Sequence, residues 1–444
     1  MKREIYKELV HWKNKDNKKP LIIKGARQIG KTYIIRQFAK ENYDDLIEIN
    51  FERDLSIKTI FEKSHDPKEL LEYFKIEYID HKIDKNTLFF MDEIQACSDA
   101  ITSLKFLSED FPCDIICSGS ALGVAIANST SYPVRYVDTW EMFPMSFTEF
   151  LEAYGVDENI ILNIKECIKN NKMIPEIIHE KMNELFDKYM LIGGMPEVVK
   201  TYIDTKSYAD CLDIQRRIVN DYLNDMIKYS DSKNAIKIRE CFSSIPVQLT
   251  KENKKFQYSV VKKGYNARHY NESLRWLEDS GLTLKVNRLK SIDYPLAGQV
   301  ELSVFKIYMA DVGLFISQLE IGDLKQIISG EMGIYKGSLY ENVVAQILKR
   351  KAKKAYYFEP SQETEIDFII EYNGTITPIE VKANKNTTSR SFNNYIDKYQ
   401  PKYAFKFSKK NVGYDKTRNL NLYPLYALEF VLENESDVLD INLK

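Results

Sequence analysis

The sequence Gly25-Ala26-Arg27-Gln28-Ile29-Gly30-Lys31-Thr32 fits the pattern G-x-x-x-x-G-K-[ST] at every position. A short apolar run, Pro20 to Ile23, precedes it, and helical spacing of apolar side chains begins after Tyr33. A strand, a glycine loop and a helix in this order predict a phosphate-binding loop, because the glycines let backbone N–H groups point at phosphate oxygens. We expect residues 25–33 to contact a nucleotide, with Lys31 at its β- and γ-phosphates and the Thr32 hydroxyl on Mg²⁺.

A second motif supports the first. The buried-strand run Thr87 to Met91 ends in Asp92-Glu93. An acidic residue at the carboxyl end of a parallel strand beside a phosphate loop is where Mg²⁺ is held, so we expect Asp92 to bind the ion, through a water. Glu93 is the expected general base for an attacking water. The two motifs together predict ATP and Mg²⁺ as cofactors and ATP hydrolysis as the reaction.

Further strands with helical runs between them give a β-α-β-α order, which predicts a doubly wound parallel α/β sheet. These strands are expected at residues 46–51, 114–117 and 135–139. Ser120, after the strand at 114–117, could sense the γ-phosphate, although a plain strand-to-loop turn explains it equally well. Arg135 is the expected charge-stabilising arginine, acting in cis or in trans, and Arg27 inside the loop is the alternative.

Five segments together resemble one prokaryotic family, the AAA-type P-loop ATPases with a C-terminal domain of the DUF4143 type. They are GARQIGKT (25–32), LFFMDEIQ (88–95), CSGSALG (117–123), WEMFPMSFTEFL (140–151) and GGMP (193–196). The family usually has Gly-Arg before the strand that leads into its Pro-x-Ser-Phe segment. Val134-Arg135 stands there in this chain, so the arginine is kept and the glycine is not.

The middle of the chain reads as helical from Met142 to about Asp231, which predicts a lid over the nucleotide or a plain helical linker. Residues 235–310 then read as helix, helix and hairpin, the order of a winged helix, and the resemblance implies the same fold. The second helix would enter a DNA major groove. Its candidate DNA-reading residues are Arg268, His269, Asn271 and Arg275. Acidic side chains on the same helix (Glu272, Glu278 and Asp279) leave protein contacts open.

The last third carries Asp367, Glu380 and Lys382 in the pattern D-x12-E-x-K. Period two places Glu380 and Lys382 on one face of a strand, and a hairpin turn at 372–374 brings Asp367 beside them. Asp367 and Glu380 are expected to hold Mg²⁺, and Glu341 on the preceding helix is expected to complete the site. Lys382 is expected either to position a water or to stabilise the charge of a phosphorane.

This arrangement resembles the PD-(D/E)xK nuclease superfamily, which implies a restriction-endonuclease-like α/β domain. Ile366 replaces the proline of the superfamily's name. Alternating Glu and Lys on a solvent-facing strand, paired as cross-strand ions, is the competing interpretation. A basic run at 349–354 is either a solvated helix end or a phosphate contact.

Composition limits the remaining classes. The chain has 444 residues with 63 Lys+Arg and 65 Asp+Glu, so its net charge of −2 excludes a protein that is basic overall, although local basic patches stay open. No run approaches the roughly 20 apolar residues that cross a bilayer, and charges interrupt the amino end where a signal peptide would lie. The six cysteines form no C-x-x-C pair. We therefore expect a cytoplasmic protein with reduced thiols and no membrane partner.

The predicted organisation is an AAA-type ATPase domain at 1–155, a helical lid at 156–230, a winged-helix domain at 231–320 and a nuclease-like domain at 321–444. The predicted function is Mg²⁺-dependent ATP hydrolysis by a protein that acts on DNA. The alternative is a nucleotide-dependent switch that binds a protein partner and has an inactive nuclease fold. A third possibility is a helicase-like motor. The chain has one phosphate loop and therefore no second ATPase core in tandem, so such a motor would need several copies of the chain in a ring. Assembly into a homo-oligomer stays open.

Overall fold

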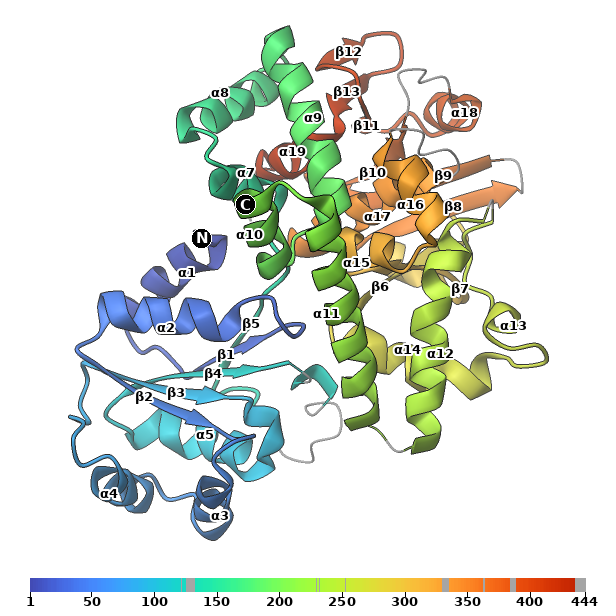
Figure 1. Ribbon diagram of the computed structural model, residues 1–444. Helices are drawn as coiled ribbons and strands as arrows, with labels where there is room; N and C mark the ends of the chain where they lie inside the picture. The colour runs from blue at the N-terminus through green and yellow to red at the C-terminus, as the bar shows by residue number, and fades with distance from the viewer. Residues whose placement is uncertain are drawn as a thin grey trace, which may run out of the picture. The chain divides into compact units, whose positions relative to one another are not determined.

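The computed structural model describes most of the chain. The described residues are 1–120, 122–124, 132–228, 230, 232–251, 253–329, 335–361, 364–383 and 389–435, with only the backbone at 232, 328 and 361. They form two compact units, one of residues 1–145 with 275–282 and the other of residues 146–274 with the rest of the chain. Figure 1 labels their helices and strands.

The first unit is built on a five-stranded sheet in the order β2-β3-β4-β1-β5, in which every pair of neighbours is parallel. The strands are β1 (Leu21–Lys24), β2 (Asp45–Asn50), β3 (Thr87–Asp92), β4 (Asp114–Gly119) and β5 (Asp138–Glu141). The predicted parallel α/β sheet is confirmed. The loop after β1 and the acidic end of β3 lie at the same edge of this sheet, because the carboxyl ends of parallel strands coincide.

Helices cover both faces of this sheet (Figure 1). They are α1 (Glu4–Lys13), α2 (Lys31–Asn42), α3 (Leu55–Lys63), α4 (Pro67–Glu77) and α5 (Ser98–Asp110). Alternate strand residues such as Ile47, Phe89 and Ile115 pack in one buried cluster with side chains of α3, α4 and α5. The period of two sends their strand neighbours toward the opposite face, where α2 and α1 lie. The three inner strands β1, β3 and β4 are therefore buried on both faces, as a covered parallel sheet requires, whereas the edge strands β2 and β5 are only partly buried.

One strand begins later than predicted. The sequence predicts a strand at 135–139, but β5 starts at Asp138, and Arg135 is an exposed residue of the preceding turn. The turn is closed by a 3.0 Å hydrogen bond from the N–H of Tyr136 to the carbonyl of Pro133. Proline fixes its own φ and favours such a turn, so the chain enters the sheet only after it.

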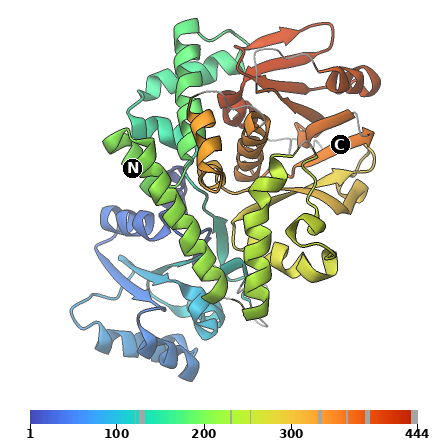
Figure 2. The ribbon, with the colours of Figure 1, turned by 45° about the vertical axis from the view of Figure 1, so that its right-hand side comes forward.

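Helices dominate the first half of the second unit. They are α7 (Phe147–Tyr154), α8 (Glu158–Lys169), α9 (Glu176–Ile192), α10 (Pro196–Thr205), α11 (Tyr208–Lys228) and α12 (Ser232–Leu249). The predicted capping box begins α7, where Glu149 N–H donates to Ser146 Oγ at 3.0 Å and Ser146 N–H donates to Glu149 Oε2 at 2.8 Å. The long helices α11 and α12 lie side by side in both Figure 1 and Figure 2. The helical character of the middle region therefore agrees with the pattern.

The glycine pair at 193–194 separates α9 from α10 and receives another segment. Gly194 N–H donates a 2.7 Å hydrogen bond to Oδ2 of Asp311, the residue that caps α15 (Val312–Ser317). A Cβ added to Gly193 would lie 2.3 Å from Oδ1 of Asp311. Only glycine permits this approach. The GGMP segment therefore has a packing role in addition to ending a helix.

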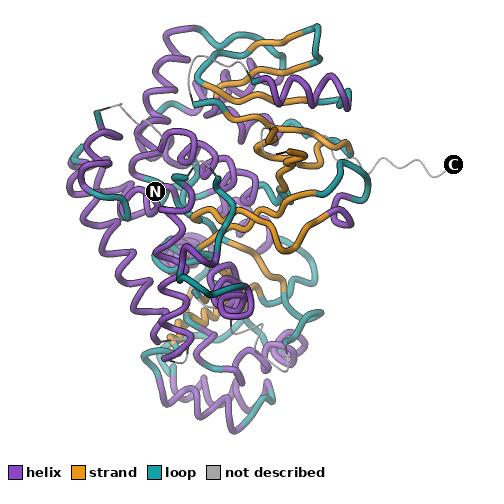
Figure 3. The backbone as a smooth tube through the Cα atoms, turned by 90° about the vertical axis from the view of Figure 1, so that its right-hand side faces the viewer, coloured by secondary structure: helices purple, strands orange, loops and turns teal. Residues whose placement is uncertain are grey.

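The second half of this unit forms an eight-stranded mixed sheet in the order β12-β13-β11-β10-β9-β8-β6-β7, whose strands are orange in Figure 3. The strands are β6 (Thr283–Leu289), β7 (Val300–Met309), β8 (Tyr356–Ser361), β9 (Thr364–Tyr372), β10 (Thr375–Val381), β11 (Ala404–Ser408), β12 (Gly413–Asp415) and β13 (Leu420–Pro424). The predicted hairpins β6–β7 and β9–β10 both pair antiparallel. β6 also pairs in parallel with β8. One sheet thus joins strands from either side of residue 320, and the three boundaries between the four predicted domains stay predictions.

The remaining helices accompany this sheet. They are α13 (Tyr258–Val261), α14 (Ala267–Asp279), α16 (Ile321–Ile328), α17 (Tyr335–Arg350), α18 (Arg390–Tyr399) and α19 (Leu428–Glu433). The order α17, β8, β9, β10, α18, β11 places one helix before these strands and one between β10 and β11. Of the predicted acidic motif, Asp367 lies on β9 and Glu380 on β10. Among the described residues, no helix is long and apolar enough to cross a membrane.

Candidate functional site

The loop after β1 has the backbone that its glycines require. Gly25 has φ 152° and Gly30, which precedes α2, has φ 91°, and both lie on the side of φ that other residues avoid. A Cβ on Gly25 would also lie 2.3 Å from the carbonyl oxygen of Met142. The loop therefore turns directly into the first turn of α2, where unpaired N–H groups favour an anion.

Lys31 is the first residue of α2 and is buried. Its ammonium donates 2.8 Å hydrogen bonds to the carbonyl oxygens of Gly25 and Ala26. Burial lowers the pKa of Lys31 to about 8, although the carboxylates of Glu93 and Asp92 act to raise it. The charged form thus lies over the phosphate loop at neutral pH.

Thr32 and Asp92 lie together. The Thr32 hydroxyl donates a 3.1 Å hydrogen bond to Oδ2 of Asp92, and the amide of Asn50 donates to the same oxygen at 3.2 Å. The hydroxyl of Ser118 donates to the other carboxylate oxygen. Hydroxyl and carboxylate oxygens are the ligands that Mg²⁺ prefers. The two predicted metal ligands therefore form a set that fits this ion.

Glu93 follows in the left-handed conformation, with φ 52°. Its Oε2 accepts hydrogen bonds from Ser120 Oγ at 3.2 Å and from Gln95 Nε2 at 2.5 Å. The predicted γ-phosphate sensor Ser120 therefore contacts the predicted general base. This contact fixes one carboxylate oxygen and orients the side chain.

A pocket opens at this edge of the sheet. It is lined by Arg27, Thr32, Arg36, Asn50, Glu52, Arg53, Asp92 and Glu93. Arg27 is held by Glu52, with Nη2 lying 3.3 Å from Oε2. Arg135 is not among the lining residues, whereas its rival Arg27 is. Sequence reasoning missed four of the lining residues, namely Arg36, Asn50, Glu52 and Arg53. Asn50 could have been found, because it ends the strand that pairs with β3 and is in register with Asp92.

The second candidate site lies in the large sheet. The ammonium of Lys382 is 2.5 Å from Oε1 of Glu380, and Oδ2 of Asp367 accepts the N–H of Val381 at 2.8 Å. The other oxygen of Glu380, Oε2, is buried and has no hydrogen-bond partner among the described residues. Burial, followed by Glu380 and Glu341, raises the pKa of Asp367 well above its usual range. Carboxylates crowded in this way favour a cation.

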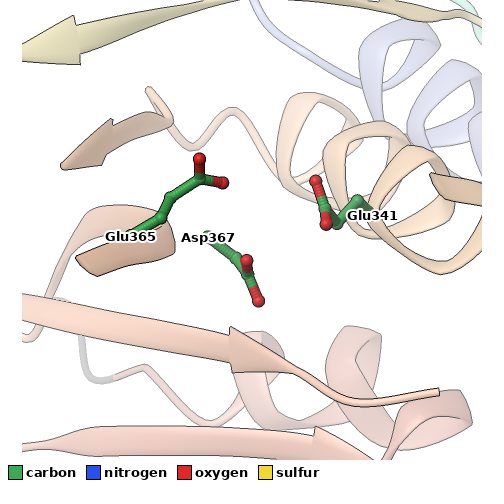
Figure 4. A group of neighbouring side chains, drawn as sticks. All are labelled: Glu341, Glu365 and Asp367. Carbon is green, nitrogen blue, oxygen red and sulfur yellow. The ribbon is translucent and has the colours of Figure 1, made fainter. Parts of the chain in front are cut away.

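Glu341 reaches the same place from α17 and forms a close group with Glu365 and Asp367 of β9, in which one carboxylate oxygen of each lies within 4.8 Å of the others (Figure 4). Burial raises the pKa of Glu341, but Lys254 and Lys306 outweigh it and bring the pKa to about 2. Sequence reasoning missed Glu365 and both lysines. Glu365 stands two residues before Asp367, so period two places both on one face of the strand. No local pattern marks the lysines.

Three family comparisons match separate parts of the chain. Residues 17–151 match the family described as AAA domain, and residues 336–428 match a domain of unknown function, DUF4143. The chain carries an AAA domain and a DUF4143 domain. Residues 183–325 match a further domain of unknown function, DUF8612. The phosphate loop and Asp92-Glu93 lie in the AAA domain, and the carboxylates 341, 365, 367 and 380 lie in the DUF4143 domain.

The solved structures that are similar to this chain have low sequence identity to it. The Walker-type ATPase PABY2304 of Pyrococcus abyssi is 13% identical, with 71% of this chain and 95% of that chain covered and a TM-score of 0.42. The Aeropyrum pernix ORC1 protein, solved in complex with DNA, is 9% identical, with 74% and 91% covered and a TM-score of 0.30. No curated protein sequence matches.

Proposed function

We propose that residues 1–155 bind ATP with Mg²⁺ and hydrolyse its γ-phosphate. The observation that carries this proposal is the meeting of Lys31, Thr32, Asp92 and Glu93 at one edge of the sheet. Thr32 and Asp92 would hold Mg²⁺, which neutralises phosphate charge when it is bound. Glu93 orients a water in line with the γ-phosphorus and accepts its proton, and Lys31 stabilises the charge that spreads over the phosphate oxygens.

The test is ATP turnover by Glu93→Gln and Lys31→Ala beside the wild type. Glu93→Gln should bind ATP with unchanged affinity and lose about 10²–10⁴-fold in turnover, because only the base is removed. Lys31→Ala should lose binding as well. Lys40→Ala, an exposed lysine at the far end of the same helix, is the matched control and should behave as the wild type. Equal turnover in Glu93→Gln and the wild type would refute the proposed base.

We further propose that residues 321–444 hydrolyse a phosphodiester bond of DNA. The observation that favours this second activity is the contact of Lys382 with Glu380, with Asp367 beside them and Oε2 of Glu380 unpartnered. Asp367 and Glu380 would hold Mg²⁺, which supplies an activated water and charge neutralisation when it is bound. Lys382 positions the water, whose oxygen bonds to phosphorus while the bond to the departing sugar oxygen breaks. The attacking water loses a proton to solvent, and the departing sugar oxygen takes one up from solvent.

A route to DNA is proposed through the segment 231–320. The order α12, α13, α14 and then the hairpin β6–β7 agrees with a winged helix. Arg268 and His269 on α14 are exposed, and Oδ1 of Asn271 accepts a 2.8 Å hydrogen bond from the Tyr258 hydroxyl. Exposed basic side chains at the start of a helix suit phosphate or base contacts. Because the same helix also carries acidic residues, the experiment must distinguish binding to DNA from binding to a protein partner.

The deciding experiment is cleavage of plasmid and single-stranded DNA with Mg²⁺ or Mn²⁺, with and without ATP. Cleavage by the wild type that is lost in Lys382→Ala and retained in Lys398→Ala, an exposed lysine on α18, would establish the nuclease. Loss of cleavage in Lys31→Ala would establish coupling to ATP. Absence of cleavage under every condition, with ATP hydrolysis intact, would favour the nucleotide switch with an inactive nuclease fold.

A further inference from the structure

The carboxylates of the DUF4143 domain are paired with lysines that come from outside that domain. Lys306 lies on β7, and its Nζ is 3.4 Å from Oε2 of Glu341 and forms a second ion pair with Oε1 of Glu365. Lys254, from the loop between α12 and α13, pairs with the other oxygen of Glu341. Both lysines precede the first residue of the DUF4143 match, residue 336.

The ammonium of Lys306 lies between carboxylates, at a position that a bound metal ion could occupy. Its side chain is only 1% exposed, and the ring centroid of Tyr357 lies 5.0 Å from its ammonium. Burying an isolated ammonium is very costly, so it persists here only because two carboxylates surround it. Tyr308, two residues along the same strand, donates a 3.0 Å hydrogen bond to Oε2 of Glu341 and satisfies the same oxygen.

The three carboxylates that Lys306 faces have the spacing of an ion site. One oxygen each from Glu341, Glu365 and Asp367 lies within 4.8 Å of the others, and Figure 4 shows the Glu341 carboxylate directed from α17 toward the two on β9. Lys306 already bonds to two of the three. The positive charge that balances Glu341 and Glu365 is thus supplied by the ammonium of Lys306.

On the opposite side of the cluster, the carboxylates of Asp367 and Glu380 face the ammonium of Lys382. Oε2 of Glu380 is buried without a hydrogen-bond partner among the described residues, and only one oxygen of Asp367 accepts a backbone N–H. Lys382 neutralises one of these two carboxylates through Oε1 of Glu380. The four carboxylates at 341, 365, 367 and 380 face the ammonium groups of Lys254, Lys306 and Lys382, so their formal charges sum to −1. One divalent cation at Asp367 and Glu380 brings this sum to +1, and a second would bring the buried cluster to +3.

We infer that Lys306 is a permanent counter-ion that takes the place of a second metal ion, so that the carboxylate site binds a single divalent cation at Asp367 and Glu380. The inference rests on the proposed phosphodiesterase function and deepens it. It assigns to the strand β7, which lies in the DUF8612 match, a residue that completes the site of the DUF4143 domain. Glu341 and Glu365 then hold the lysine and do not bind the metal.

The test counts Mn²⁺ bound to the full-length chain by electron paramagnetic resonance without nucleotide. An Asp92→Asn background removes the carboxylate of the nucleotide site, so that the count reports the second site. We expect one bound Mn²⁺ in this background and none after Glu380→Gln. Lys306→Met should bind two, because the oxygens of Glu341, Glu365 and Asp367 become available. Two ions in the background, or an unchanged count in Lys306→Met, would overturn the inference.

A second variant serves if Lys306→Met fails to fold. Glu365→Gln changes a side chain that is 35% exposed. If Glu365 holds only the lysine, its loss should leave the count at one and change the Mn²⁺ dissociation constant by less than about threefold. If Glu365 is a metal ligand, the affinity should fall by at least about tenfold, which contradicts the inference. No bound Mn²⁺ in the background would refute the proposed phosphodiesterase itself, and one ion that is indifferent to position 306 would refute only the role of Lys306.

Discussion

The hydroxyl of Thr32 and Oδ2 of Asp92 are joined by a 3.1 Å hydrogen bond across sixty positions of sequence. Thr32 belongs to the helix that follows β1, and Asp92 ends β3, which is separated from β1 by β4. The contact therefore depends on the whole strand order and not on a local turn. It places two oxygen ligands of the kind that Mg²⁺ prefers beside the phosphate loop.

Replacing Asp92 by Asn should weaken the response to Mg²⁺. The amide keeps the size of the side chain but removes the negative charge that Thr32, Asn50 and Ser118 face. We expect the Mg²⁺ concentration for half-maximal ATP turnover to rise about 10–100-fold. Asp110→Asn, an exposed aspartate at the end of α5, should leave it unchanged. An identical Mg²⁺ titration for Asp92→Asn would exclude this residue as a ligand.

ATP affinity should fall at alkaline pH because burial lowers the pKa of Lys31 to about 8. Below pH 8 the ammonium is charged before ATP arrives, so binding requires no proton. Above pH 8 the free protein must take up a proton to pair with the phosphates, and the dissociation constant should rise by up to about tenfold per pH unit. Titration of a fluorescent ATP analogue with Mg²⁺ between pH 7 and 9.5 measures this.

Lys31→Arg provides the comparison for the pH series. The guanidinium stays charged throughout this range, so its dissociation constant should be larger at pH 7 but nearly independent of pH. If the wild type and Lys31→Arg show the same slope, the pH dependence belongs to another group.

If α14 contacts DNA as proposed, this contact should be visible in the salt dependence of binding. Arg268 is exposed near the start of this helix. If it contacts a phosphate, Arg268→Ala should lower affinity for all duplexes alike and reduce the slope of log K against log salt by about one. Arg239→Ala removes the same charge from an exposed position on α12 and should leave the slope unchanged. Anisotropy of labelled DNA at several salt concentrations separates the two, and equal slopes for both variants would argue against α14 as the reading helix.

The local parts of the molecule could be predicted from sequence, and the non-local parts could not. The phosphate loop could be predicted from its glycines, which adopt positive φ values that other residues rarely adopt. The β9–β10 hairpin could be predicted from the turn at 372–374. Glu365 could have been predicted as part of the site, because it stands two residues before Asp367 on the same face of a strand. Lys306 could not have been predicted from the sequence. Its ion pair with Glu365 depends on the parallel pairing of β6 with β8, which joins strands more than sixty residues apart. The strand predicted at 135–139 begins too early, because the turn closed by Tyr136 and Pro133 keeps Arg135 outside the sheet.

Gly193→Ala should destabilise the second unit strongly. Gly193 has φ 70° and ψ −165°, and an added Cβ would lie 2.3 Å from Oδ1 of Asp311 and 2.7 Å from the N atom of Gly313. The backbone strain and the clash together should lower the free energy of unfolding by about 3 kcal/mol or more. Gly155→Ala is the matched control, because Gly155 has φ 93° but its added Cβ would meet nothing within 4 Å. The free energy of unfolding of Gly155→Ala should fall by only roughly 1–2 kcal/mol, which is the cost of placing alanine in the left-handed conformation. Urea unfolding of both variants checks the difference, and equal losses would show that the approach of Asp311 to the glycine pair contributes nothing beyond backbone conformation.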